Sequence, residues 1–136
     1  MNPTNGIDSP WQAGYSTSEH AFVWLQSHPE HFRLFMTWMP LERHGLPEFI
    51  DIFPFEQEIG QDTTDDDVLF VDIGSALGSQ SLLIRNKLPN LKGRVIMQDQ
   101  QLVIDAWNAD PKLGIEAMVY DFFTPQPVKG KLCKVV

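Results

Sequence analysis

The sequence predicts an α/β fold in which parallel strands alternate with helices and follow an N-terminal helical segment. Three observations carry this prediction. The apolar run VLFVDI ends at Gly74, and the helical pattern SQSLLIRNKL begins just after a second glycine, Gly78. Two more apolar segments, GRVIMQD and IEAMVYD, each end in an aspartate. Strands that are separated by helices of about ten residues pair in parallel through right-handed crossovers.

The N-terminal part of the chain is predicted to be helical after a flexible lead-in. Residues 1–18 form that lead-in, since Asn, Pro, Gly and Ser dominate most of it without periodicity. Two helices are predicted between Glu19 and Pro40, and the second begins at Pro29, where the missing N–H costs no hydrogen bond. We therefore assign residues 19–60 to a helical segment that serves packing or dimerisation.

Phe, Trp and Met are dense between residues 22 and 55. One interpretation is a lid or wall over an apolar ligand. The other, which we favour, is the buried face of helices that pack on a sheet or on another chain. Helices that are apolar on two sides also favour a dimer, because exposed apolar patches usually mark an interface.

Residues 61–136 are assigned to the sheet domain, which begins in an acidic loop. Its carboxylates have no fixed spacing and no accompanying histidine, so they predict a solvated loop rather than a metal site. The expected strands and helices then alternate along the chain. The strands are Val68–Ile73, Gly93–Asp99, Ile115–Asp121 and a candidate fourth at Lys131–Val136, and the helices are Ser79–Leu88 and Leu102–Trp107.

Composition narrows the class of function. A chain of 136 residues is one domain by the usual length prior, and its net charge of −8 argues against a nucleic-acid partner. Its single cysteine excludes an intrachain disulfide and fits an intracellular compartment. No apolar run approaches the roughly 20 residues of a membrane helix, and the N-terminus lacks a signal-peptide pattern. We expect a cytoplasmic protein without a membrane partner.

The glycine turn after the first strand is the first candidate site. Gly74 is expected to adopt a backbone conformation that side chains resist, and Gly78 to let a ligand approach the next helix. A helix N-terminus carries unpaired N–H groups and a partial positive charge, which suit a carboxylate or a phosphate. The pattern alone is equally typical of an ordinary turn.

Two aspartates strengthen the hypothesis of a nucleotide-like ligand. Asp99 ends the second strand about twenty residues after the glycine turn, where an acidic residue meets ribose hydroxyls in dinucleotide sites. The alternative is an N-cap for the following helix. Asp121 ends the third strand, with Met118 three residues earlier. This edge would hold an adenine ring by its amino group and an apolar face, and the alternative is loop capping.

The segments VDIGSALGS, GRVIMQD and IEAMVYDFFTPQPVKG, in this order and spacing, resemble the S-adenosylmethionine-binding part of fungal small-molecule O-methyltransferases. Upstream, HPEHFRLFMTWM and FIDIFPFE resemble the region that precedes that part. The resemblance covers about residues 19 to 130. It implies a partial Rossmann-like, class I methyltransferase sheet. Its most diagnostic segment is DFFTPQPVKG, which no general turn argument explains.

The resemblance implies a role for each matching residue of the cofactor site. It places Gly74 and Gly78 beside the methionine moiety. It places Asp72 at the strand end and Asp99 at the ribose. It implies that Met118 and Asp121 clamp the adenine and that Phe122 follows them. The implied residues are Asp72, Gly74, Gly78, Asp99, Met118, Asp121 and Phe122. Ser75 and Ala76 stand where the family has further glycines. Because both residues are small, the backbone stays accessible.

A larger departure concerns the catalytic base. The resemblance implies that family members are much longer and that their general-base histidine lies in a later His-Asp-Trp context. No histidine follows His44 here, so no catalytic residue is assigned. His20 also lies in the helical region, and capping or surface roles are expected for His28 and His31, which flank a helix start. No metal site is expected, because the H-x-x-H spacing lacks a third ligand.

The sequence therefore predicts an S-adenosylmethionine-binding, O-methyltransferase-like protein of fungal secondary metabolism. Its relatives would methylate a hydroxyl of an aromatic or polyketide metabolite, and the family's C-terminal catalytic part is expected to be absent. The alternative is a non-methylating member that acts as a cyclase or isomerase, or as a partner subunit. A third interpretation is a fragment without a function of its own. The expected partners are a small-molecule metabolite and a second copy of the chain.

Overall fold

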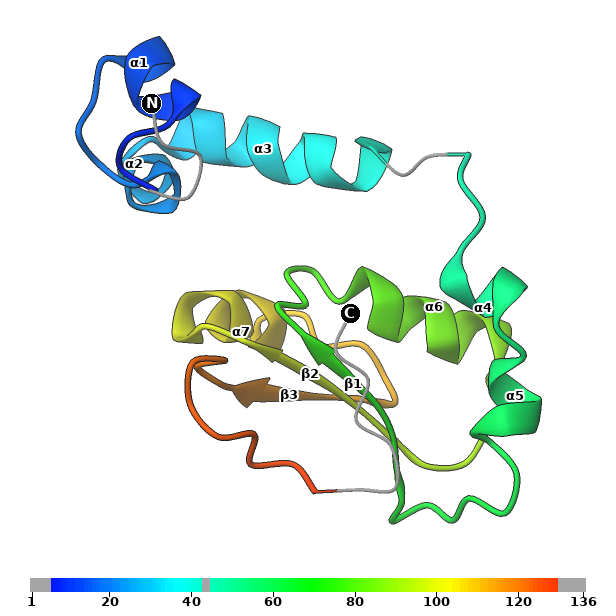
Figure 1. Cartoon of the computed structure of the whole chain (residues 1–136). Helices are drawn as coiled ribbons and strands as arrows, with labels where there is room; N and C mark the ends of the chain where they lie inside the picture. Colours follow the sequence, from blue (N-terminus) through cyan, green and yellow to red (C-terminus); the bar gives the residue numbers. More distant parts are fainter. Residues whose placement is uncertain (1–5, 43–44, 130–136) are drawn as a thin grey trace. The chain divides into compact units, whose positions relative to one another are not determined.

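The computed structural model describes residues 6–42 and 45–129, and the chain divides into two compact units, 1–46 and 47–136. We call them the helical unit and the sheet unit and describe each by itself (Figure 1). The helical unit contains α1 (Pro10–Tyr15), α2 (Ala21–Ser27) and α3 (Pro29–Glu42). None of the described helices has the length and apolar character that crossing a membrane requires.

Helix α1 lies inside the segment that the sequence predicted as a flexible lead-in. Ser9 caps it, since its Oγ accepts a hydrogen bond from the Trp11 N–H at 3.3 Å, and Pro10 occupies the first helical position. The Gln12 side chain completes the capping box and also donates to two backbone oxygens on either side of the helix, each at 2.8 Å. These hydrogen bonds outweigh a composition typical of a loop.

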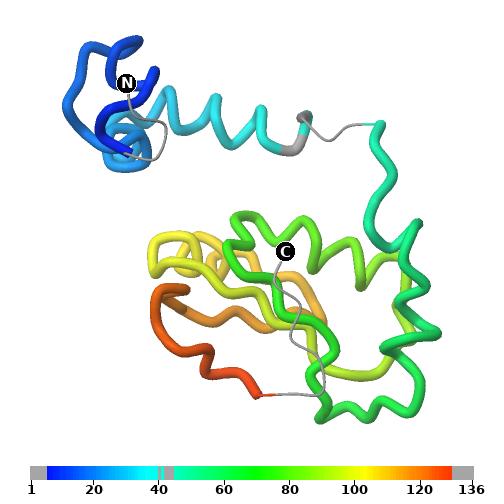
Figure 2. The backbone as a smooth tube through the Cα atoms, in the orientation of Figure 1, coloured from blue at the N-terminus to red at the C-terminus, as the bar shows by residue number. Residues whose placement is uncertain are grey.

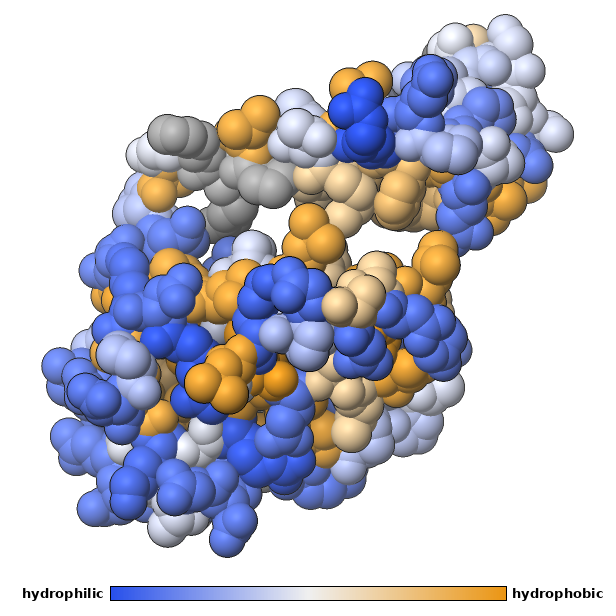
Figure 3. All heavy atoms as spheres, turned by 180° about the vertical axis from the view of Figure 1, so that it is seen from behind, coloured by the Kyte–Doolittle hydropathy of each residue, from blue (hydrophilic) through white to orange (hydrophobic). Residues whose placement is uncertain are grey.

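An aromatic cluster joins the three helices of this unit. Trp24 is buried at its centre, with the His28 ring stacked on it at 3.7 Å and Tyr15 tilted against it at 4.5 Å between ring centroids. Trp24 is therefore buried among helices of its own unit, whereas the favoured interpretation named a sheet or another chain as the packing partner. Figure 3 shows hydrophobic atoms on the surface of this unit. Other apolar side chains of α2 and α3 remain exposed: Phe22, Val23, Leu34, Trp38, Met39 and Leu41.

The sheet unit confirms the predicted α/β class. Its three strands are parallel in the order β1-β2-β3, and a helix connects each strand to the next. The predicted fourth strand lies outside the described residues. The elements of this unit are α4 (Phe49–Ile52), α5 (Phe55–Glu58), β1 (Val68–Ile73), α6 (Ser79–Lys87), β2 (Arg94–Asp99), α7 (Gln101–Asn108) and β3 (Ile115–Val119).

The two faces of the sheet are covered differently. Helices α6 and α7 cover one face, where Ile84 and Trp107 pack among the core residues of the strands (Figure 1). On the other face, Val71 and Ile96 are almost fully buried, and Val128 packs against them from the segment that follows β3. The sheet is therefore a middle layer, with helices on one side and an extended loop on the other.

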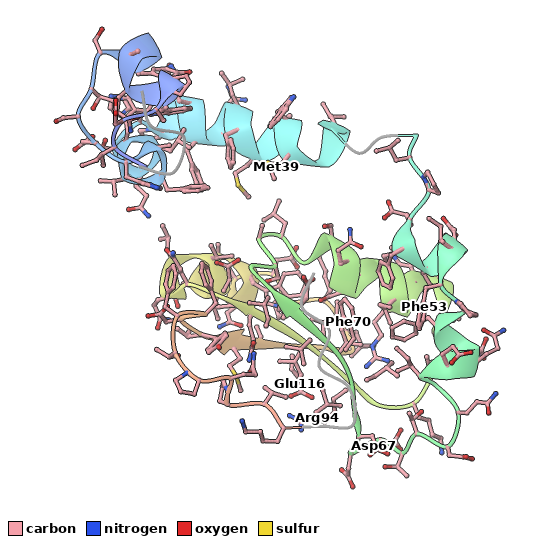
Figure 4. The ribbon with its side chains drawn as sticks, in the orientation of Figure 1. Met39, Phe53, Asp67, Phe70, Arg94 and Glu116 are labelled. Atoms are coloured by element: carbon pink, nitrogen blue, oxygen red, sulfur yellow. The ribbon has the colours of Figure 1, made fainter. Side chains whose placement is uncertain are left out.

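The division between the two units lies between residues 46 and 47, earlier than the change near residue 60 that the sequence suggested. Short helices α4 and α5 belong to the sheet unit because their aromatic side chains enter its core. The Phe49 ring stacks on Phe70 of β1 at 5.8 Å, and Phe55 is 1% exposed. Figure 4 shows Phe70 and Phe53 among these side chains.

Polar side chains fasten the end of the sheet where the strands begin. Arg85 of α6 donates to three backbone oxygens: to Gly114 O at 2.7 Å, to Leu91 O at 3.1 Å and to Gly93 O at 2.6 Å. Arg94 of β2 forms an ion pair with Glu116 of β3 at 2.7 Å (Figure 4). These hydrogen bonds and this ion pair fix the loops at the amino ends of the strands. The candidate ligand site lies at the opposite end, where the strands finish.

Candidate functional site

The strand register brings three chain segments together at the carboxyl edge of the sheet. Ile73 of β1 lies opposite Gln98 of β2, and Gln98 lies opposite Met118 of β3. The glycine turn, Asp99 and the residues after β3 therefore follow side by side at one edge. Open α/β sheets bind ligands at this edge.

The first part of the glycine turn is held by β2 and is open on its outer side. The N–H groups of Gly74 and Ser75 both donate to the Gln98 carbonyl, at 2.9 Å and 3.3 Å. Gly74 has a φ of +73°, and, its chain neighbours aside, no heavy atom of the described residues lies within 4 Å of the position that a Cβ would occupy. The left-handed backbone and the open space together suit the close approach of a ligand.

Gly78, at the start of α6, has a second role that the sequence did not reveal. Its φ is +67°, and a Cβ there would lie 2.9 Å from Trp107 Cζ3 and 3.5 Å from Met97 Sδ. The missing side chain thus lets α6 pack against α7 and β2. The expected place of Gly78 in the cofactor site remains a prediction.

Asp72, at the end of β1, contacts α6 rather than open space. Its side chain is buried, and its Oδ2 accepts hydrogen bonds from the Ser81 N–H at 3.2 Å and the Ser81 hydroxyl at 2.9 Å. Burial raises the pKa of Asp72, the Ser81 hydrogen bonds partly offset this rise, and the nearby Asp99 carboxylate adds to it. Asp72 therefore fixes the first turn of α6 beneath the glycine turn. Sequence reasoning missed Ser81, which lies in the first helical turn after Gly78.

Asp99 joins the glycine turn to the end of β2. Its Oδ2 accepts from the Ala76 N–H at 2.8 Å, and its Oδ1 accepts from the Gln100 N–H at 2.7 Å. Ala76 has a left-handed φ of +48°, which turns its N–H into this bond. An ionised carboxylate has about four acceptor sites, so about two remain for hydroxyl donors. Gln100, and not Asp99, is the N-cap residue of α7.

The segment after β3 presents Asp121 and Phe122 to solvent. Asp121 Oδ1 accepts from the Phe123 N–H at 3.0 Å, and the Asp121 carbonyl accepts from Thr124 N and Oγ1. Its second carboxylate oxygen has no hydrogen-bond partner among the described residues. Asp121 thus caps its own turn and keeps one acceptor open. Phe122 is 57% exposed beside Phe123, at 4.5 Å between ring centroids.

Met118, in β3, lies on the face of the sheet away from α6 and α7. Its side chain packs against the cluster that contains Val71 and Ile96. Its sulfur accepts a hydrogen bond from the Gln98 amide at 3.2 Å. The structure therefore places Met118 in the apolar cluster of this face, and its expected contact with adenine remains a prediction. Sequence reasoning missed Gln98, although a glutamine inside an apolar strand was a visible signal.

The described histidines all belong to the helical unit. His20 caps α2 by accepting from the Phe22 N–H at 3.3 Å, while His28 and His31 contact Trp24 in the aromatic cluster. His44 lies outside the described residues. Within residues 6–42 and 45–129, no group of three or more His, Cys, Asp or Glu side chains is arranged to hold a metal ion.

No family model matches the sequence, but curated proteins do. The chain is 40% identical to O-methyltransferase okaF of Penicillium ochrochloron over 130 residues, which are 93% of this chain and 34% of that protein. It is 39% identical to a demethylsterigmatocystin 6-O-methyltransferase of Aspergillus flavus over 127 residues, 93% of this chain and 32% of that protein. The chain therefore spans about a third of the length of these relatives.

Solved structures agree with the sequence comparison. A structure described as "A Pericyclic Reaction enzyme" matches with a TM-score of 0.73 and 38% identity over 93% of this chain and 32% of that chain. LepI in complex with SAM matches over the same shares with a TM-score of 0.72 and 38% identity. OxaC, at 24% identity and a TM-score of 0.71 over 96% of this chain and 33% of that chain, supports the fold alone. The predicted resemblance to fungal secondary-metabolite O-methyltransferases is thus confirmed.

Proposed function

We propose that this chain binds S-adenosylmethionine at the carboxyl edge of its sheet. In this proposal, it forms the donor-binding part of an enzyme that methylates a hydroxyl of an aromatic or polyketide-like metabolite. The observation that carries the proposal is the pairing of two carboxylates at neighbouring strand ends. Asp99 and Asp121 each keep acceptor capacity; Asp99 ends β2, which lies beside β1 and its glycine turn, and Asp121 follows β3 on the other side of β2.

Each part of the proposed ligand has a matching group. The open side of Gly74 receives the amino-acid end, since a Cβ there would have no atom of a non-neighbouring described residue within 4 Å. The free acceptor sites of Asp99 suit the two ribose hydroxyls, and the open oxygen of Asp121 suits the amino group of adenine. Phe122 offers an exposed ring beside the base. When bound, S-adenosylmethionine supplies an activated methyl group, and the chain's residues hold and orient it.

The experiment is calorimetric titration of the chain with S-adenosylmethionine and S-adenosylhomocysteine. Replacing Asp99 by Ala is expected to weaken binding about 10-fold or more, because hydrogen bonds to a charged group are worth about 1.5–3 kcal/mol each. The matched control is Asp65→Ala, which removes an exposed carboxylate from the acidic loop. Failure of the unaltered chain to bind millimolar ligand would contradict the proposal.

A second candidate function is cyclisation or isomerisation of a metabolite. It is favoured by the 38% identity to the structure described as a pericyclic reaction enzyme. Shape and a few hydrogen bonds promote such reactions by orienting a substrate without transfer of a methyl group. Mass spectrometry of the product separates the candidates, because methylation adds the mass of one CH₂ group and isomerisation adds none.

We further propose that the helical unit mediates a homodimer. Its exposed side chains include Leu34 and Trp38 of α3, which are 58% and 52% exposed. Exposed apolar patches of this kind usually mark an interface. Light scattering is expected to give the mass of a dimer for the unaltered chain and of a monomer for Leu34→Glu/Trp38→Glu. A monomer at micromolar concentration without these changes would contradict the proposal.

A further inference from the structure

The segment of residues 120–129, which we call the return loop, turns back across the sheet after β3 (Figure 2). It contains most of the DFFTPQPVKG motif, which turn chemistry alone did not explain. Its far end packs Val128 against Val71 and Ile96, on the face away from α6 and α7. Asp121 and Phe122 stand at its near end, beside the proposed adenine position. The return loop thus connects a ligand-facing turn to the core.

A hydrogen-bonded pair of glutamines, of which Gln98 is buried and Gln126 partly buried, joins this loop to the sheet. Gln126 Nε2 donates to Gln98 Oε1 at 2.8 Å, and Gln98 Nε2 donates to Gln126 Oε1 at 2.9 Å. Gln126 Oε1 also accepts from the Val128 N–H at 3.0 Å. Gln98 is fully buried, and its amide contacts Met118, which packs against the apolar cluster on this face. A polar group is costly there unless it is hydrogen-bonded, so the pair strongly favours one position of the loop.

The backbone on both sides of Gln126 is restricted by proline. Pro125 and Pro127 fix their own φ angles, and Pro127 also confines the preceding Gln126 to extended conformations. At the other end of the loop, the Tyr120 N–H donates to the Asp99 carbonyl at 2.9 Å, and the Tyr120 hydroxyl donates to the Thr124 carbonyl at 2.8 Å. The turn at Asp121 is therefore held between two anchors.

Gln98 also holds the glycine turn. Its backbone carbonyl accepts the N–H groups of Gly74 and Ser75, while its side chain accepts from Gln126. The next residue, Asp99, bonds the Ala76 N–H. One residue of β2 therefore sets the position of the glycine turn with its main chain and that of the return loop with its side chain.

We infer that Gln98 and Gln126 form a partly buried amide pair that positions the return loop, so that Asp121 selects the adenine base of the ligand. The inference rests on the proposed binding of S-adenosylmethionine. Both glutamines are positioning residues, because they act through Asp121. Their expected effect falls on the choice of base more than on binding of the methionine and ribose parts.

The test compares two ligands that differ only at the base. S-adenosylhomocysteine carries an amino group that donates to a carboxylate, whereas S-inosylhomocysteine carries a carbonyl at the same ring position. The unaltered chain is expected to prefer the adenosyl ligand by about 10-fold or more, since one hydrogen bond to a charged group distinguishes them. Calorimetry gives both affinities.

The main variant is Gln98→Leu/Gln126→Leu, which replaces both amides by apolar groups of similar size. Replacing both partners leaves neither side-chain amide unpaired, and only the partly buried Val128 N–H loses its acceptor, so the chain is expected to fold. Its preference for the adenosyl ligand is expected to fall to about 3-fold or less, with little change for the inosyl ligand. Backbone amides of residues 120–126 are expected to exchange hydrogen faster. Gln126→Ala is a second variant with the same expected direction.

Two controls separate loop position from general loss of stability. Gln57→Leu makes the same chemical change on the exposed surface of α5. Val95→Ala weakens packing on the opposite face of the sheet, where Val95 is fully buried. Both controls are expected to keep the preference for the adenosyl ligand.

The outcomes distinguish the inference from the proposed function. If the double variant keeps both the ligand preference and the slow exchange of residues 120–126, the positioning role is overturned and the proposed function stands. If Val95→Ala reduces the preference as strongly, the effect reflects stability, and the inference also fails. If the unaltered chain binds neither ligand, the proposed function and the base-selecting role fail together.

Discussion

Replacing Gly78 by Ala should destabilise the sheet unit far more than its single methyl group suggests. Gly78 has a φ of +67°, a left-handed conformation that costs an L-residue about 1–2 kcal/mol. The new methyl would also lie 2.9 Å from Trp107 Cζ3 and 3.3 Å from Trp107 Cη2. Favourable carbon contacts lie at about 3.5–4.0 Å, so the Trp107 ring or helix α6 must move.

The magnitude follows from adding these two effects. Trp107 is 8% exposed and packs in the cluster with Met97 and Ile104, so its ring has little room to shift. Overpacking of a core costs about 1–3 kcal/mol. Together with the backbone cost, the free energy of unfolding is expected to fall by about 2–5 kcal/mol. Whole domains are stable by only about 5–15 kcal/mol, so this is a large fraction.

Gly74→Ala is the matched control. Its φ of +73° imposes nearly the same backbone cost, but within the described part of the chain only its sequence neighbours lie within 4 Å of the new Cβ. Its expected loss is therefore about 1–2 kcal/mol, and the effect of alanine on the unfolded chain cancels between the two variants. Urea unfolding followed by far-ultraviolet circular dichroism measures both.

Two results test the reasoning further. Trp107→Leu removes the ring atoms that the methyl would contact, so its own cost should be smaller in the Gly78→Ala background. If Gly78→Ala loses no more stability than Gly74→Ala, the contact with Trp107 does not restrict this position, and the argument is refuted. A loss of ligand affinity without a loss of stability in Gly78→Ala would also refute it.

Three further predictions concern charged residues of the sheet unit. Burial raises the pKa of Asp72 in the folded state above its ordinary value of 3.8, which applies to the unfolded state. The free energy of unfolding should therefore fall as the pH rises from 3.8 through the pKa of the folded state. Asp72→Asn, which keeps an acceptor for Ser81, should abolish this slope in urea titrations at several pH values. Arg85→Lys, which cannot reach all three carbonyls, should lower the unfolding free energy by about 1–3 kcal/mol in urea titrations. Glu116→Gln should change the unfolding free energy by less than about 1 kcal/mol in thermal melts, because its ion pair with Arg94 is half exposed.

Each of these predictions has a contradicting result. A variant with Asn at position 72 that retains the slope would show that another group titrates. Full stability of Arg85→Lys would mean that one or two of its hydrogen bonds suffice. A large loss in Glu116→Gln would mean that the pair is screened from solvent far more than its exposure indicates.

The sequence was sufficient to predict which residues meet at the carboxyl edge. Gly74, Asp99 and Asp121 each follow an apolar run, and parallel pairing brings such ends together whatever the details of the helices. The helix α1 was missed because its cap, Ser9, lies in a segment whose composition is typical of loops. Local hydrogen bonds decide a short helix, and composition averages over them.

The contacts that tune the site could not be predicted in the same way. The partner of Gly78 is Trp107 in another helix, and the partner of Gln98 is Gln126, 28 residues later. Such pairs depend on how the helices and the return loop pack on the sheet. The spacing of apolar residues in the sequence predicts the helices and strands but not these contacts. Asp72 illustrates the same limit, because only the packing of α6 directs its carboxylate toward Ser81.

The geometry of the candidate site depends on the register of β2 as much as on the glycine turn. Successive residues of a strand point to opposite faces, so Gln98 reaches the return loop on one side while Asp99 bonds the Ala76 N–H of the glycine turn. A slip of one residue would exchange these two side chains and turn the apolar residues of β2 to the wrong faces. The burial of Val95, Ile96 and Met97 therefore fixes the register. The register in turn directs Gln98 to Gln126 and Asp99 to the Ala76 N–H. In this sheet, the apolar core and the polar site are specified by the same strand alignment.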